Sequence, residues 1–191
     1  MNKLAILLCG VGGTGKSTTA TYLEKCLKKK NYNTKLIRFD EFRKSLAPLG
    51  VDPFSKDSAV KNIIYKRAAE EFSNFLDEGL SLIIDSGLSN ENIRKKLLIS
   101  VGSLKIVHLY CPLFVAIYRD TFRSIRGEKH ERGSYLHMKA IFSLVNPFQK
   151  KFDQPGITYP FDYPECAHLH VNTFFKSPDE ISREICQKLR I

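Results

Sequence analysis

Glycine, lysine and serine residues near the amino terminus follow a spacing that suits phosphate binding. Residues 10–17 read GVGGTGKS and match the pattern G-x-x-x-x-G-K-[S/T]. An apolar run at 4–9 precedes them, and a helical pattern at 17–30 follows. In that context the glycines let successive N–H groups point at phosphate oxygens, and the helix adds its positive dipole end. The segment therefore predicts a P-loop, and a plain glycine-rich turn is the alternative.

The residues of this loop divide between charge neutralisation and metal binding. Lys16 is expected to bridge the β- and γ-phosphates of ATP, and the Ser17 hydroxyl is expected to hold Mg²⁺. The guanine-reading N/T-K-x-D motif is absent, and 191 residues leave little room for a motor. We therefore expect a kinase. Its predicted ATP contacts in the loop are Gly10, Gly12, Gly13, Thr14, Gly15, Lys16, Ser17 and Thr18.

Charged side chains follow two other apolar runs. Asp40 comes at the end of a predicted strand at 34–39, and Arg43 follows three residues later. A carboxylate there can accept the proton of an acceptor hydroxyl or organise Mg²⁺, and an arginine can bind an acceptor phosphate. Asp85 ends the predicted strand 80–85 and is a further Mg²⁺ candidate. The alternatives are a helix cap and surface ion pair for Asp40 and Arg43, and a strand-end cap for Asp85.

Strands and helices alternate along the chain, which predicts an α/β fold with right-handed crossovers. We expect one domain, 1–191, with the three-layer P-loop NTPase fold: a mostly parallel five-stranded sheet covered by helices on both faces. Ligands of such sheets bind beyond the carboxyl ends of the strands. The basic segment 119–164 is long for a connection and is a candidate lid. The remaining expected strands are 104–110 and 168–171, and the remaining expected helices are 60–76, 90–100, 113–124 and 178–189.

Charge and composition limit the classes of partner that the chain is expected to bind. The net charge of +10 favours an anionic partner, which includes nucleotides, nucleic acid and acidic membranes. No nucleic-acid motif is visible, so a basic nucleic-acid-binding module is the alternative from another class. No apolar stretch approaches the roughly 18 residues of a membrane span. The five scattered cysteines contain no CxxC pair, which favours reduced thiols and a cytoplasmic location.

Several segments in order resemble the adenylylsulfate (APS) kinase family. Its members carry a P-loop, then Asp-Gly-Asp-x-x-Arg after the second strand, and phosphorylate the 3′-hydroxyl of a nucleotide's ribose. Asp40 and Arg43 fall on the second Asp and the Arg of that motif. Residues 109–120, LYCPLFVAIYRD, resemble its strand-Cys-Pro-Leu-x-Val segment, which ends in Arg-Asp. Residues 156–165, GITYPFDYPE, align without a gap on its Gly-Ile-x-x-Pro-Tyr-Glu-x-Pro-Glu region.

The acceptor side departs from the family pattern. Where members carry Phe-Ser-x-x-Asp-Arg-x-x-Asn-Ile-Arg-Arg, residues 54–65 read FSKDSAVKNIIY. The chain keeps Phe54, Ser55, Asn62 and Ile63 but lacks the Asp-Arg and the terminal arginine pair. Two or three acceptor-side charges are therefore missing.

The segment after the third strand and the lid also differ from the family pattern. From the family's Ser-Phe-Ile-Ser-Pro the chain keeps Ser86 and Ser89 but neither the aromatic residue nor the proline. The Lys-Gly-Leu-Tyr lid motif is missing, and its lysine position falls on Phe122. Arg123 or Arg126 would supply that cation after a small shift.

The resemblance implies specific contacts and partners. Arg119 would contact ATP. The resemblance also implies that Mg²⁺ is a cofactor and that the protein forms a homodimer. Tyr159, Phe161 and Tyr163 are candidates, together with Phe152, for stacking on a base, with core packing as the alternative. The implied acceptor contacts are Arg43, Phe54, Asn62, Ser86, Ser89, Arg123, Arg126 and Phe152.

A rebuilt acceptor side favours a different acceptor on the same scaffold. In this respect the chain resembles the cytidine diphosphoramidate kinase branch of capsule-modification pathways. We therefore expect ATP-dependent transfer to the 3′-hydroxyl of cytidine diphosphoramidate, with APS as the alternative acceptor. The expected mechanism is direct in-line transfer without a covalent enzyme intermediate.

Overall fold

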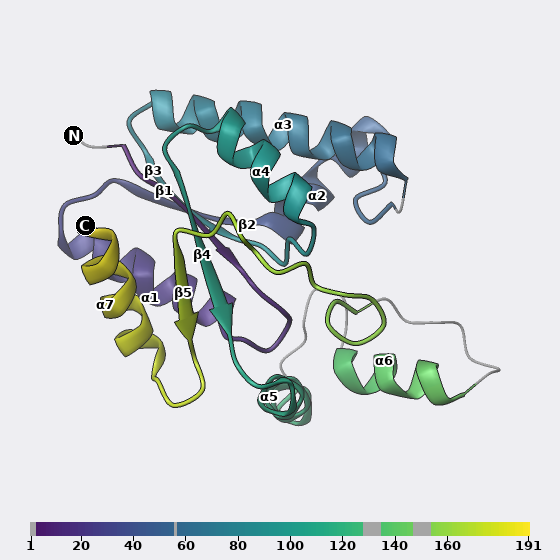
Figure 1. Ribbon diagram of the computed structural model, residues 1–191. Helices are drawn as coiled ribbons and strands as arrows, with labels where there is room; N and C mark the ends of the chain where they lie inside the picture. Colours follow the sequence, from purple (N-terminus) through teal and green to yellow (C-terminus); the bar gives the residue numbers. More distant parts are fainter. Residues whose placement is uncertain (1–2, 56, 128–134, 147–153) are drawn as a thin grey trace.

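Five parallel strands form one sheet in the order β2-β3-β1-β4-β5 (Figure 1). The structure is a computed structural model that describes residues 3–55, 57–127, 135–146 and 154–191. The predicted five-stranded α/β sheet is confirmed, and each of its strand pairs is parallel. The strands are β1 (Ala5–Cys9), β2 (Thr34–Arg38), β3 (Ser81–Asp85), β4 (Leu104–Tyr110) and β5 (Leu169–Asn172).

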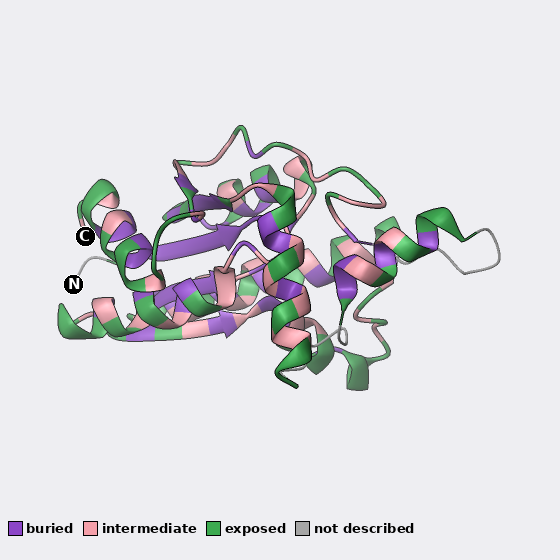
Figure 2. Cartoon of the chain, turned by 90° about the horizontal axis from the view of Figure 1, so that it is seen from below, coloured by how far each residue is buried: buried purple, intermediate pink, exposed green. Residues whose placement is uncertain are grey.

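The central strand β1 supplies both hydrophobic cores. All five of its residues are buried, because helices cover the sheet on both sides (Figure 2). Successive side chains point to opposite faces. Ala5, Leu7 and Cys9 therefore join one core, while Ile6 and Leu8 join the other.

The helices form two outer layers and an extension. α1 and α7 pack on one face of the sheet, and α2, α3 and α4 pack on the other. α5 and α6 lie beyond the carboxyl ends of the strands (Figure 1). The helices are α1 (Lys16–Lys29), α2 (Phe39–Ser45), α3 (Ser58–Asp77), α4 (Glu91–Ser100), α5 (Leu113–Ile125), α6 (Leu136–Val145) and α7 (Pro178–Leu189), with a 3₁₀ turn at Ala47–Leu49.

Local chemistry sets the helix starts. Asp57 caps α3, Asn90 caps α4, and Ser177 forms a capping box with Glu180 at the start of α7. The expected helices therefore begin and end within a few residues of those observed. The expected lid segment, 119–164, begins inside α5 and contains α6.

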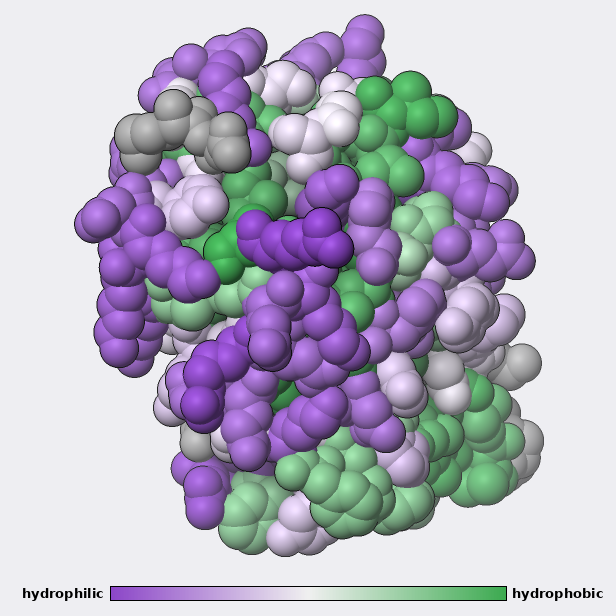
Figure 3. Space-filling model, turned by 60° about the vertical axis from the view of Figure 1, so that its left-hand side comes forward, coloured by the Kyte–Doolittle hydropathy of each residue, from purple (hydrophilic) through white to green (hydrophobic). Residues whose placement is uncertain are grey.

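Charged and polar residues cover most of the face shown in Figure 3, and hydrophobic residues gather toward its lower edge. Among the described residues, every helix is too short or too polar to span a lipid bilayer.

Candidate active site

A cleft of about 930 Å³ opens at the carboxyl ends of the strands. Its walls come from the P-loop, the segments after β2 and β3, and helices α5 and α6. Of the residues predicted for the site, it brings together Gly10, Gly12, Gly13, Gly15, Lys16, Ser17, Thr18, Asp40, Arg43, Phe54, Asp85, Ser86, Ser89 and Arg123.

Two glycines of the P-loop allow a close approach to neighbouring backbone. Gly10 has φ 147°, and a Cβ built there would lie 2.2 Å from the carbonyl oxygen of Leu109. Gly13 has φ 78°, and its Cβ would lie 2.3 Å from the carbonyl oxygen of Ala116. Backbone atoms cannot move aside as a side chain can, so these two positions require glycine.

The N–H groups of the P-loop are available for a ligand. Thr14 N–H donates to the Val11 carbonyl at 3.4 Å, and the Thr14 side chain is buried below the loop. Within the described part of the chain, the N–H groups of Gly12, Gly13 and residues 15–18 have no hydrogen-bond partner. A row of unpaired backbone amides at a helix start suits phosphate binding.

The side chain of Lys16 folds back onto the P-loop. Its Nζ donates to the carbonyl oxygens of Gly10 and Val11, each at 2.9 Å. Desolvation lowers the pKa of its ammonium, while the carboxylates of Asp85 and Asp40 oppose that lowering. A polyphosphate entering the cleft would add negative charge and favour the ammonium form.

The carboxylates and cations of the acceptor side are loosely paired. Asp40 lies in the first turn of α2, with Oδ1 4.0 Å from Arg43 Nη1, and the Arg43 guanidinium lies 5.1 Å from the centre of the Phe54 ring. Asp85 Oδ2 lies 3.8 Å from Arg38 Nη1. Both pairs are partly buried, and both distances lie near the outer limit for an ion pair. Both carboxylates therefore retain capacity for other ligands.

The oxygen donors in the cleft fit Mg²⁺. Mg²⁺ prefers hard oxygen ligands and usually takes one or two carboxylates together with substrate phosphates and water. The hydroxyl of Ser17 and the carboxylates of Asp40 and Asp85 face the same cleft. No cluster of three or more His, Cys, Asp or Glu side chains suited to a metal occurs in the described ranges. Mg²⁺ bound at these oxygens would take its other ligands from substrate phosphates and water.

Other predicted contacts lie outside the cleft. Asn62 lines a separate groove between α3 and α4. Arg126 is exposed and its guanidinium lies 4.5 Å from the centre of the Phe122 ring. The Arg119 guanidinium donates to the carbonyl oxygen of Thr173 at 2.8 Å, so it holds the segment after β5. Phe152 lies outside the described residues.

The aromatic candidates separate into two groups. Tyr159 lines the cleft. Phe161 stacks on His108 with ring centres 5.7 Å apart, and Tyr163 stacks on His170 at 5.2 Å. Phe161 and Tyr163 therefore pack at the edge formed by β4 and β5, and Tyr159 stays a candidate for stacking on a base.

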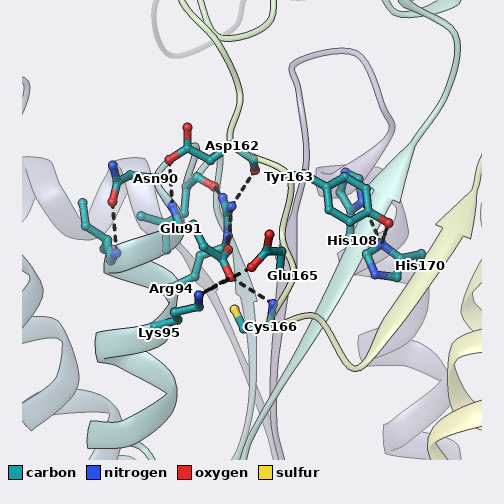
Figure 4. Close-up of polar contacts among 12 residues, drawn as sticks. Asn90, Glu91, Arg94, Lys95, His108, Asp162, Tyr163, Glu165, Cys166 and His170 are labelled. Carbon is teal, nitrogen blue, oxygen red and sulfur yellow. Dashed lines mark hydrogen bonds and ion pairs between the residues drawn. The ribbon is translucent and has the colours of Figure 1, made fainter.

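A buried arginine fixes the wall of the cleft next to Ser89. Arg94 is fully buried and donates to the carbonyl oxygens of Leu88 and Asp162, both at 2.6 Å, and its Nη2 lies 2.8 Å from Glu91 (Figure 4). Burial alone would raise the pKa of Glu91, but hydrogen bonds from the Cys166 amide and from Arg94 outweigh it and lower that pKa. This network joins the start of α4 to the segment before β5.

We expect Arg94→Met to lower the free energy of unfolding by roughly 3–5 kcal/mol, because Glu91 would lose its buried partner. The neighbouring Lys95 is half-exposed and lies 3.7 Å from Glu91, so Lys95→Met should cost less than about 1 kcal/mol. Urea unfolding of both variants measures the difference, and equal losses would contradict the role given to Arg94.

The pH dependence of that variant provides a second measurement. Because the folded-state pKa of Glu91 lies below its ordinary value of 4.5, its contribution is present above that value and is lost as pH falls through the folded-state pKa. The difference in stability between the wild type and Arg94→Met should therefore become smaller in acid, and the part due to the two carbonyl hydrogen bonds should remain.

Sequence reasoning missed a pair of buried residues in the cleft. His137 in α6 and Asp120 in α5 both line it, with His137 Nδ1 3.0 Å from Asp120 Oδ2. Gln154 also lines the cleft and is buried. A lone histidine in a basic segment carries no sequence signal, because more than 100 residues separate it from the P-loop that it contacts.

The parallel sheet, the unpaired loop amides and the charged cleft together define a P-loop nucleotide-binding protein. A family model described as an AAA domain matches residues 6–144. The adenylyl-sulfate kinase of Marinobacter nauticus is 30% identical over 175 residues, covering 90% of this chain and 76% of the relative. The probable adenylyl-sulfate kinase of Pyrococcus abyssi is 29% identical over 191 residues, covering 100% and 97%. The chain belongs to the adenylylsulfate kinase family.

Solved structures agree on the fold. The APS kinase of Mycobacterium tuberculosis in complex with AMPPNP and APS has a TM-score of 0.74 and 20% identity, covering 99% of this chain and 98% of that one. The family resemblance found in the sequence is therefore confirmed. The comparisons favour the APS alternative over the expected cytidine diphosphoramidate, and they lend no support to a capsule pathway.

Proposed function

We propose that the protein transfers the γ-phosphoryl group of ATP to the 3′-hydroxyl of an anionic nucleotide, with APS as the first candidate acceptor. The observation that carries the proposal is one cleft that holds free P-loop amides, Lys16, two carboxylates and Arg43. The relatives named adenylyl-sulfate kinase support the choice of APS.

The residues divide the chemistry as follows. The P-loop amides and Lys16 bind the triphosphate and neutralise its charge. Asp40 accepts the proton of the acceptor hydroxyl, and Arg43 binds an anionic group of the acceptor. Mg²⁺, held by Ser17 and by Asp40 or Asp85, would supply further charge neutralisation. Most of the rate acceleration comes from positioning and electrostatics.

Cytidine diphosphoramidate is the second candidate acceptor. The acceptor-side segment 54–65 lacks the Asp-Arg and the arginine pair of the APS kinases that it resembles. Lys61, at an unspecified position of that pattern, lines the cleft and offers a cation to an acceptor. This difference supports an acceptor whose charges lie elsewhere.

An ATP-consumption screen tests both acceptors. Purified protein with Mg·ATP is offered APS, cytidine diphosphoramidate, CDP and simple nucleosides, and ADP release is measured. Turnover at least ten times faster with APS than with the cytidine compounds supports the first candidate, and the reverse order supports the second. ADP release that no acceptor stimulates would contradict both.

Three further expectations, on nucleic-acid binding, oligomeric state and location, are each tested by a separate measurement. A gel-shift assay at moderate salt tests the nucleic-acid alternative, which predicts tight binding with a steep salt dependence. Light scattering during size exclusion tests the proposed homodimer. Fractionation of cells tests the proposed cytoplasmic location.

A further inference from the structure

The side chain of His137 faces the P-loop. A Cβ built on Gly12 would lie 3.1 Å from His137 Cε1 and 3.6 Å from Nε2. His137 is fully buried, and its Nε2 has no hydrogen-bond partner among the described residues. A buried polar atom without a partner is unusual in a native protein and calls for an explanation, of which a ligand is one. The cleft that His137 lines provides room for that ligand.

Asp120 positions the imidazole from α5. Its Oδ2 lies 3.0 Å from His137 Nδ1, an ion-pair contact rather than an aligned hydrogen bond, and accepts the backbone N–H of His137 at 3.1 Å. Burial alone would raise the pKa of Asp120, but the contacts with His137 outweigh it and lower that pKa. The carboxylate holds the ring with Nε2 toward the P-loop, and an Nε2 that carries a proton can donate to a phosphate oxygen.

The position along the P-loop identifies the phosphate involved. Lys16 Nζ lies at the carbonyl oxygens of Gly10 and Val11, next to Gly12. The lysine of a P-loop reaches the β- and γ-phosphates. The Gly12 stretch is therefore the end of the loop that faces the terminal phosphates of ATP.

We propose that His137, positioned by Asp120, donates a hydrogen bond from Nε2 to the γ-phosphate of ATP. His137 thereby adds a second contact on the α5–α6 side of the cleft, next to Arg123, which also lines it. A donor there stabilises the negative charge of the phosphoryl group during transfer. The proposal rests on the proposed phosphoryl transfer, but it is tested by nucleotide binding alone.

The experiment compares the binding of Mg·ATP and Mg·ADP by calorimetry, without any acceptor. In His137→Ala the ratio of the ADP to the ATP dissociation constant should fall roughly 10- to 100-fold, the range for a hydrogen bond to a charged group. His137→Gln keeps an N–H donor and should recover part of the ratio. Lys139→Gln removes a charge from an exposed position of the same helix, and its ratio should stay within about twofold of wild type.

Asp120→Asn provides an independent readout. Its amide oxygen can still accept the His137 N–H, but the negative charge is gone, so the ratio should fall by less than in His137→Ala. Equal weakening of ATP and ADP in His137→Ala, or an unchanged ratio, would show that His137 only packs against the loop. Wild-type protein that binds neither nucleotide would overturn the kinase proposal and this inference together. Preferential ATP binding without turnover of any acceptor would contradict the proposed function alone.

Discussion

Replacing Lys16 with alanine is expected to lower kcat by roughly 10²- to 10³-fold, the loss seen when one preorganised electrostatic donor is removed from an active site. The ammonium lies at the P-loop carbonyls, within electrostatic range of both candidate carboxylates. It is therefore placed to stabilise the negative charge that develops on the transferred phosphoryl group. Steady-state ADP release with the acceptor identified by the screen measures the effect.

Lys29→Ala is the matched control for that variant. Lys29 lies exposed in the last turn of the same helix, α1, so the substitution changes the net charge equally. Its kcat should stay within about twofold of wild type because surface charges this far away are screened. A Lys16→Ala enzyme as active as Lys29→Ala would remove Lys16 from the chemistry.

Replacing Asp40 with asparagine is expected to lower kcat by roughly 10²- to 10⁴-fold, the contribution of a general base. The substitution keeps the shape of the side chain and a hydrogen-bonding oxygen, but it removes the proton acceptor. The 4.0 Å contact with Arg43 is too loose to require the charge for folding. The melting temperature should therefore change by only a few degrees.

Asp85→Asn separates a base from a metal contact. Both carboxylates line the cleft, so each variant is assayed across a range of Mg²⁺ concentrations. Excess Mg²⁺ should restore activity to a variant that lost only metal affinity, and it should leave a missing base uncorrected. Near-normal kcat in Asp40→Asn at any Mg²⁺ concentration would exclude Asp40 as the base.

Local patterns made the fold and the phosphate site predictable. The strands are apolar runs bounded by glycine, proline or polar residues. Because β1 is buried on both faces, its residues are apolar throughout and do not alternate with polar residues as in a half-exposed strand. The P-loop lies in eight consecutive residues, and its neighbours in sequence are its neighbours in space. Such sites can be predicted from one sequence.

The residues that face the acceptor are set by the rotation of each helix about its axis and by contacts between distant segments. Residue spacing in the sequence predicts neither of these well. Successive residues of an α-helix point about 100° apart, so Lys61 faces the cleft while Asn62 faces the groove between α3 and α4. Arg126 follows the end of α5 and stacks on Phe122. The contact between His137 and Gly12 joins segments that no local pattern connects.

The P-loop begins where the deepest strand of the sheet ends. Since β1 contributes to both cores, unfolding of the sheet also removes the strand to which the loop is attached. Nucleotide that binds only the native state adds stability by mass action, about 4 kcal/mol at a thousand times its dissociation constant. Depletion of cellular ATP would thus leave the enzyme both idle and more exposed to proteolysis.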